Sequence, residues 1–271
     1  MLTAILNNKA GRIEQGGESL PWRDVFKTYE DLLTATVFER FNYLSQNTQN
    51  QFISFLLEGT LDKSTLDLGR LINIEYWPRF SIENNSQSSV EPDLILCFEN
   101  ANVLIEVKPP SGGGQYYAQW EREVSALKNN SRYTNKKLYF VALGGVNEAI
   151  HNDELTKLKG KFSDFITHAN ILNWQQVASF LLNDCEGCDE RDTRIINDII
   201  AAIGLYGVNT LNLNWQQLQS HSFKVLSLQH NNFQHAVKNT LKDWQPLTTF
   251  TSSLNKNTLN NLRTWKNSYE Q

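Results

Sequence analysis

Apolar residues recur at helical spacing in the segment that follows residue 28. They fall on every third or fourth position of one face, as in an amphipathic helix that packs on a core. We expect this helix to begin at Thr28, because Thr28 and Asp31 have the spacing of a capping box. A second helix is predicted over residues 51–57, after a polar turn. The apolar positions of the first helix are Leu33, Val37, Phe41 and Leu44.

Short apolar runs replace the helical spacing after residue 70. They are rich in β-branched and aromatic residues and too short for helices, so each predicts a strand. The polar residues 99–102 between two of them predict a hairpin turn. Residues 115–129 return to helical spacing. The order of helix, three strands, helix and strand predicts an α/β domain with a mixed central sheet flanked by helices. The predicted strands are residues 72–80, 94–98, 103–107 and 137–143.

The pattern is mostly helical after residue 150. The segment Leu-Asn-Trp-Gln-Gln occurs twice in this part, and Asn173 and Asn214 within it are predicted helix N-caps. We therefore divide the chain into three parts. These are a loose polar N-terminal arm, residues 1–27, a core, residues 28–185, and a helical C-terminal extension, residues 186–271. The predicted helices of the last two parts are residues 150–165, 174–182 and 189–204.

The composition of the 271-residue chain is that of a folded globular protein, with 40% hydrophobic and 20% charged residues. No apolar run approaches the ~20 residues that a membrane span needs. The first twenty residues carry four charges and lack the apolar stretch of a secretory signal. Three cysteines are too few, and odd in number, for a disulfide-stapled secreted scaffold. We expect a cytoplasmic protein that does not act at a membrane.

The net charge of −4 does not itself indicate nucleic-acid binding, but it is unevenly distributed. Residues 194–271 contain seven Lys/Arg and three Asp/Glu, so they carry +4 and the first 193 residues carry −8. Six of these basic residues, together with two tryptophans, could contact a nucleic-acid backbone and stack on bases. They are Lys224, Lys238, Lys242, Lys256, Arg263 and Lys266, with Trp244 and Trp265. Solvated lysines on a helical cap are the alternative interpretation. An acidic core that acts on a polyanion needs help, so we expect a homo-oligomer or a protein partner.

Two short motifs, Pro92-Asp93 and Glu106-Val107-Lys108, place charged side chains at one end of the predicted sheet. Glu106 and Lys108 project from the same face of their strand, because side chains alternate along it. The predicted hairpin places Asp93 opposite them. Two close carboxylates repel each other unless a cation lies between them, and a hard ion such as Mg²⁺ prefers oxygen ligands. The alternative is an incidental surface pair of Glu106 and Lys108 on a half-exposed hairpin.

These motifs and the order of the predicted elements resemble the PD-(D/E)XK, or restriction-endonuclease-like, nuclease superfamily. The resemblance covers residues 28–174. It implies a restriction-endonuclease-like core and Mg²⁺-dependent hydrolysis of phosphodiester bonds, usually in DNA, with Mn²⁺ able to substitute. By this resemblance Asp93, Glu106 and the Val107 carbonyl bind the metal, and Lys108 serves the attacking water and contacts the nucleic acid.

The resemblance also implies a glutamate on the first helix and a glutamine on the helix after the second motif. Glu30, Asp31 and Glu39 are the candidates for the glutamate, and we favour Glu30 because it lies on the apolar face. Gln115 and Gln119 are one helical turn apart. We assign Gln115 to catalysis and Gln119 to nucleic-acid binding, and a solvated polar face explains both equally well.

By this resemblance we expect a metal-dependent nuclease, an endonuclease or an exonuclease, that acts on DNA within a bacterial restriction, defence or mobile-element system. Two alternatives stay open: an RNA nuclease, and a non-catalytic nucleic-acid-binding or assembly subunit that keeps the nuclease fold. The second alternative predicts replacement of Asp93, Glu106 or Lys108, and all three are present. Cys185 and Cys188 have the spacing of zinc ligands, but no second pair accompanies them.

Overall fold

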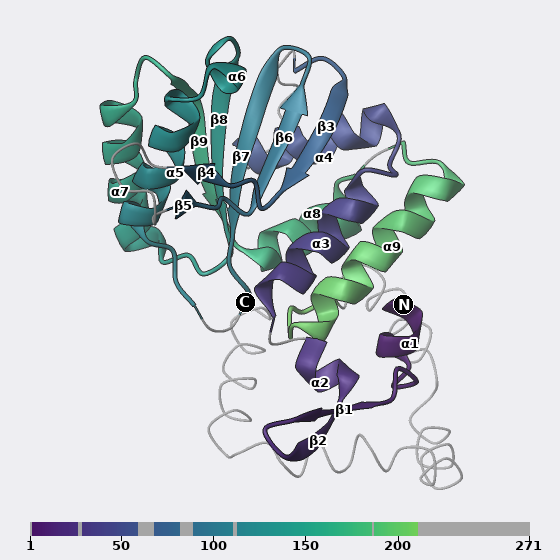
Figure 1. Cartoon of the computed structure of the whole chain (residues 1–271). Coiled ribbons are helices and arrows are strands. Elements are labelled where there is room, and N and C mark those ends of the chain that lie inside the picture. The colour runs from purple at the N-terminus through teal and green to yellow at the C-terminus, as the bar shows by residue number, and fades with distance from the viewer. Residues whose placement is uncertain are drawn as a thin grey trace, which may run out of the picture. The chain divides into compact units, whose positions relative to one another are not determined.

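The computed structural model describes residues 2–26, 29–58, 68–81, 89–110, 113–185 and 187–210 (Figure 1). The chain divides into two units, Met1–Asn212 and Leu213–Gln271, and all described residues belong to the first. The predicted caps Thr28 and Asn214, and most of the predicted C-terminal extension, lie outside the described residues. Within the described part of the chain, no helix is both long enough and apolar enough to span a membrane.

A five-stranded mixed sheet forms the centre of the described unit. The sequence predicts a mixed sheet, but only four of its strands. The strand order of the sheet is β3-β6-β7-β8-β9. The strands span Leu71–Tyr76, Leu94–Phe98, Ala101–Val107, Lys137–Leu143 and Ile166–Leu172 in that order. β3, β6 and β7 pair antiparallel, whereas β7, β8 and β9 pair parallel. The change from antiparallel to parallel pairing therefore falls on β7, the central strand.

Helices cover both faces of this sheet (Figure 1). Helices α3, α4, α8 and α9 pack on one face, and α5, α6 and α7 pack on the other. They span Glu30–Phe41, Gln46–Glu58, Trp174–Asn183, Glu190–Leu205, Tyr117–Lys128, Ser131–Thr134 and Glu148–Lys161 in the same order. The apolar face predicted for the first helix is buried. All seven residues of β7 are also buried, so a charged side chain on this strand is removed from bulk water.

The strand predicted over residues 72–80 is broken in the structure. Trp77 has a φ of 49°, a left-handed conformation that a strand does not accommodate, and β3 ends just before it. The chain resumes as the short strand β4 (Phe80–Ser81), which pairs with β5 (Ser89–Val90). The hairpin that results leads directly into Pro92 and Asp93.

β9 has no counterpart among the predicted strands. Its apolar residues are interrupted by Thr167, His168 and Asn170, which obscure the β pattern. The sheet tolerates them because β9 is an edge strand. The Asn170 side chain also has a specific partner, since its Nδ2 donates to the carbonyl oxygen of Leu56 in α4 at 3.0 Å.

The N-terminal residues, predicted as a loose polar arm, are folded where they are described. They form α1 (Leu2–Leu6), the hairpin of β1 (Arg12–Gln15) and β2 (Glu18–Pro21), and α2 (Trp22–Phe26). Leu2, Ile5 and Phe26 join the core, and the Tyr206 hydroxyl donates to the Phe26 carbonyl oxygen at 2.9 Å. These partners come from α9 and the residues that follow it, which the sequence assigned to a separate extension. The contacts are long-range, so local pattern could not reveal them.

The N-cap of α3 is Tyr29 and not the predicted Thr28, which lies outside the described residues. Tyr29 makes no side-chain cap hydrogen bond, and Asp31 is exposed. The prediction for Asn173 is confirmed. Its side chain accepts from the backbone N–H of Gln176, whose own side chain accepts from the Asn173 N–H.

Candidate metal centre

Three carboxylates meet where β6 begins and β7 ends. Asp93 directly precedes β6, and the antiparallel register places it beside Glu106 on β7. The backbone N–H of Val107 donates to Asp93 Oδ2 at 2.8 Å, which fixes the position of this carboxylate. One carboxylate oxygen each from Glu30, Asp93 and Glu106 lies within 4.8 Å of the others. The convergence predicted from the two motifs is therefore present.

The glutamate that joins the pair from α3 is Glu30. It is the first residue of the helix, and its side chain is 29% exposed. Asp31 and Glu39, the two other candidates, are exposed on the same helix and lie outside the cluster. The helical phase inferred from the apolar residues therefore selected the acid that lies in the cluster.

Lys108 places its ammonium among these carboxylates. Its Nζ donates to Glu106 Oε1 at 2.6 Å, to Glu30 Oε1 at 2.9 Å and to the Val107 carbonyl oxygen at 3.1 Å. Asp93 Oδ2 lies 4.0 Å from the same nitrogen. Lys108 is only 9% exposed and Glu106 is fully buried. The interpretation of Glu106 and Lys108 as an incidental surface pair is therefore wrong.

The backbone at Lys108 is fixed by the neighbouring elements. Its N–H donates to the carbonyl oxygen of Leu143 at 2.7 Å, and its own carbonyl oxygen accepts from Trp174 Nε1 at 2.7 Å. Gly144 makes this close approach possible, because a Cβ at this position would lie 1.9 Å from the Lys108 carbonyl oxygen. Its φ of 78° also favours glycine. Strand β8 and helix α8 therefore determine where the lysine side chain starts.

The two glutamines predicted on the next helix have different surroundings. Gln115 Nε2 donates to the carbonyl oxygens of Glu106 and Gly144, and its Oε1 accepts from Trp120 Nε1. Its side chain therefore ties the loop before α5 to the ends of two strands. Gln119, by contrast, donates from Nε2 to Glu106 Oε1 at 2.6 Å. The structure thus brings Gln119, rather than Gln115, to the carboxylates.

Glu123 is a fourth acid, and the sequence analysis missed it. It is 1% exposed, and its Oε1 accepts from Gln119 Nε2 at 3.0 Å, so one amide bridges Glu106 and Glu123. Among the described residues, Oε2 of Glu106 and Oε2 of Glu123 are both buried without a hydrogen-bond partner. A signal was available, because Glu123 lies three residues after Trp120 on the apolar face of its helix.

Burial dominates the electrostatics of the cluster. It raises the pKa of Asp93 to about 8, and the Glu106 carboxylate adds to the effect. Burial also raises the pKa of Glu106 to about 8 and that of Glu123 to about 7. Burial alone would lower the pKa of Lys108, but the surrounding carboxylates outweigh it and hold the pKa well above its usual value. The lysine is therefore an ammonium near neutral pH, whereas Asp93 and Glu106 retain protons unless a cation replaces them.

We predict that the metal-free protein loses stability as pH rises from about 5 to 8. The raised pKa values mean that the folded state holds protons which the unfolded state has already released in this range, so stability falls until the folded-state pKa values are passed. Thermal unfolding in EDTA should show a midpoint lower by roughly 5–10 °C at pH 8 than at pH 5.5. Asp93→Asn should flatten this profile. A midpoint that rises with pH in the wild type would contradict the prediction.

The donor set fits a hard divalent cation. Glu30, Asp93, Glu106 and the Val107 carbonyl offer only oxygen atoms, as Mg²⁺ or Mn²⁺ prefers. The buried, unpartnered Oε2 of Glu106 also calls for a cation or a proton. Among the described residues, these three acids form the only group of His, Cys, Asp and Glu close enough to share an ion. Cys185 and Cys188 lie with their Sγ atoms 3.1 Å apart but gather no further ligands.

The fold and the site define an α/β protein with a carboxylate cluster and a buried lysine at the end of its central strand. No protein-family model matches the chain, and no solved structure matches it. A protein of Pasteurella multocida (strain Pm70), described as uncharacterized protein PM0110, is 30% identical to it over 231 residues. The match covers 79% of this chain and 83% of the relative. The chain therefore belongs to the same family as this Pasteurella protein.

Proposed function

We propose that this protein is a metal-dependent nuclease with a restriction-endonuclease-like core, and that it hydrolyses phosphodiester bonds in DNA. The observation that carries the proposal is the group of Glu30, Asp93 and Glu106 with Lys108 at the end of β7. The mixed sheet, with its antiparallel hairpin followed by parallel strands, supports the nuclease fold. A non-catalytic subunit would have no need to keep a buried lysine among three acids.

Each side chain has a distinct task under this proposal. Asp93, Glu106 and the Val107 carbonyl hold the cation, with Glu30 closing the site from α3. A bound Mg²⁺ supplies Lewis-acid stabilisation of charge that develops on the phosphate and lowers the pKa of water. Lys108 adds a permanent positive charge beside the reacting phosphate, where a preorganised charge favours the transition state. Gln119 orients the Glu106 carboxylate by its 2.6 Å hydrogen bond.

The direct test is a cleavage panel with end-labelled linear duplex, circular duplex, single-stranded DNA and RNA of one sequence. We expect products with Mg²⁺ or Mn²⁺ and none in EDTA. Cleavage of RNA alone would replace the DNA assignment with the RNA alternative. Metal-independent cleavage, or no cleavage of any substrate by protein that binds Mn²⁺, would contradict the proposal.

We predict that Glu30→Gln reduces cleavage by about 10²-fold or more, and that Glu39→Gln leaves it within two-fold of wild type. Glu30 lies 2.9 Å from the Lys108 ammonium and faces the other acids, whereas Glu39 is exposed on the same helix. The two variants remove the same charge from one helix, so each controls for the other. Single-turnover rates at saturating Mg²⁺ provide the comparison. A larger loss in Glu39→Gln would show that α3 presents a different face to the substrate.

A further inference from the structure

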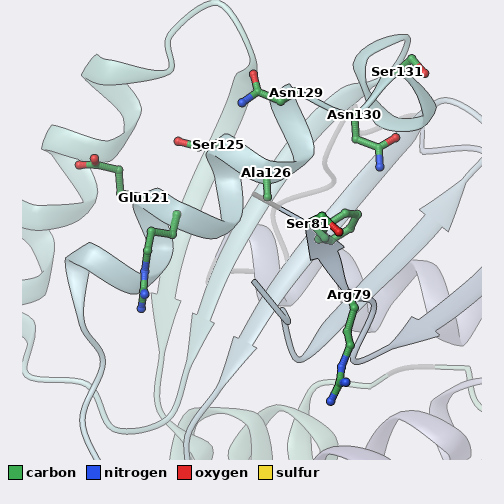
Figure 2. A pocket seen from close by; sticks show the side chains of 10 residues that line it. Arg79, Ser81, Glu121, Ser125, Ala126, Asn129, Asn130 and Ser131 are labelled. Carbon is green, nitrogen blue, oxygen red and sulfur yellow. The ribbon is translucent and has the colours of Figure 1, made fainter. Parts of the chain in front are cut away.

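A cavity of about 630 Å³ lies between β4, with Arg79 just before it, and α5 with the turn that follows it (Figure 2). Figure 2 shows Arg79 and Ser81 on one side, and Ser125, Asn129 and Asn130 from α5 and the turn after it on the other. Most of the ten side chains that line it carry hydrogen-bond donors. The cavity is therefore suited to a polar ligand with many acceptor atoms.

The charges in the cavity favour an anion. Arg79 and Arg122 contribute two guanidinium groups, of which Arg79 pairs with Glu91, and Glu121 contributes the one lining carboxylate. That carboxylate is already neutralised, because Lys161 Nζ lies 2.6 Å from it. Arg122 is exposed, its Nε donates to the Ala118 carbonyl oxygen, and it forms no salt bridge within the described part of the chain. Guanidinium groups with amide and hydroxyl donors are the groups that bind phosphate oxygens.

Both walls of the cavity continue into elements that carry the metal centre. On α5, Gln119 and Glu123 face the carboxylates, whereas Arg122 and Ser125 line the cavity. The β4–β5 hairpin, which forms the other wall, begins after Arg79 and leads into Asp93. The carbonyl oxygen of Asp93 accepts a hydrogen bond from the Trp77 N–H at 3.1 Å. The carboxylates and the cavity are therefore lined from two sides of the same helix, α5.

The dimensions suit a nucleic-acid strand. From Gln119 to Asn129, α5 advances by about 15 Å at 1.5 Å per residue. One strand of a duplex advances by about 3.4 Å per nucleotide, so this length corresponds to roughly four nucleotides. The hydrogen-bond donors along α5 are thus spread over a length greater than that of one phosphate group.

We propose that this cavity binds the phosphodiester backbone of the substrate on one side of the cleaved bond. This inference rests on the proposed nuclease function and adds the place where the strand lies. The lining offers donors to phosphate oxygens and only Phe80 as an aromatic side chain, so the contact is largely independent of sequence.

The test measures binding without cleavage. A fluorescein-labelled 20-base-pair DNA is titrated with protein in Ca²⁺, and the dissociation constant is followed between 50 and 200 mM salt. We expect Arg122→Ala to weaken binding at least five-fold at low salt and to reduce the slope of log K against log[salt] by about 1, the loss of one phosphate contact. Ser125→Asp, as a separate variant, should also weaken binding, because it adds a negative charge to the cavity. Arg194→Ala is the matched control, because Arg194 is an exposed arginine on α9 that pairs with Glu190.

The outcomes separate the two proposals. If Arg122→Ala and Ser125→Asp bind DNA with the same affinity and salt dependence as Arg194→Ala, the cavity does not hold the strand. The nuclease proposal is then still tested independently by the cleavage panel. If the wild type binds no nucleic acid and cleaves none, both proposals fail. Circular dichroism of each variant confirms the fold, and we expect no change because Arg122 is exposed on its helix.

Discussion

Asp93→Asn and Glu106→Gln are expected to abolish cleavage, each by about 10³-fold or more, and to remove Mn²⁺ binding. Both carboxylates belong to the cluster within 4.8 Å, and a divalent ion supplies several kcal/mol of transition-state stabilisation that leaves with it. The fold should persist, because each amide copies the shape of a protonated carboxyl group. In the absence of metal, loss of the repulsion between buried acids should even raise the unfolding temperature slightly.

Isothermal titration with Mn²⁺ and single-turnover cleavage measure the two parts of this prediction. Asp31→Asn is the matched control, because Asp31 is an exposed acid directly after Glu30 and takes no part in the cluster. It should bind Mn²⁺ and cleave as the wild type does. Unchanged Mn²⁺ isotherms in both Asp93→Asn and Glu106→Gln would exclude a metal site here.

Lys108→Ala should separate metal binding from cleavage. An ammonium cannot coordinate a metal, so the carboxylates remain available and Mn²⁺ binding is retained. Cleavage should fall by roughly 10²–10⁴-fold, the range for a positioned electrostatic or acid–base group. Lys108→Arg should not restore it, because the planar guanidinium is larger and places its charge differently. Its surroundings are also tightly filled, since Lys108 is only 9% exposed.

Single-turnover rates at saturating Mg²⁺ and Mn²⁺ titrations of both variants test this prediction. Lys128→Ala is a suitable control, because Lys128 is a half-exposed lysine that pairs with Asp164. Wild-type rates in Lys108→Ala would show that its ammonium has no part in the reaction. Loss of Mn²⁺ binding together with cleavage would indicate that the end of β7 had been disrupted.

The central part of the site could be predicted because short-range rules fix it. A tight hairpin sets the register of β6 against β7, and that register alone places Asp93 beside Glu106. Helical phase was enough to prefer Glu30 over Glu39. The order of strands β3, β6, β7 and β8 of the central sheet followed from the length and composition of the apolar runs.

Features that depend on distant partners could not be predicted. Asn170 lies on a strand, and its amide is satisfied by α4, more than a hundred residues earlier. Helical phase places Glu123 on the apolar face of α5, but its proximity to Glu106 follows from the way α5 packs on β7. Residues 1–27 were predicted as a loose arm because they are polar. The few apolar residues of α1 and α2 instead join a core to which the distant helix α9 contributes. Local pattern carries none of this information.

The lysine among the acids gives the pocket an internal counter-ion. With Glu30, Asp93 and Glu106 ionised, and with Lys108 and the fourth acid, Glu123, protonated, the net charge is −2, so one divalent ion would leave the pocket electrically neutral. A monovalent ion leaves a buried charge uncompensated, and a second divalent ion introduces a surplus of the opposite sign. Both states are unfavourable in a poorly solvated site. The arrangement therefore favours single occupancy and sets a valence requirement that does not depend on the size of the ion.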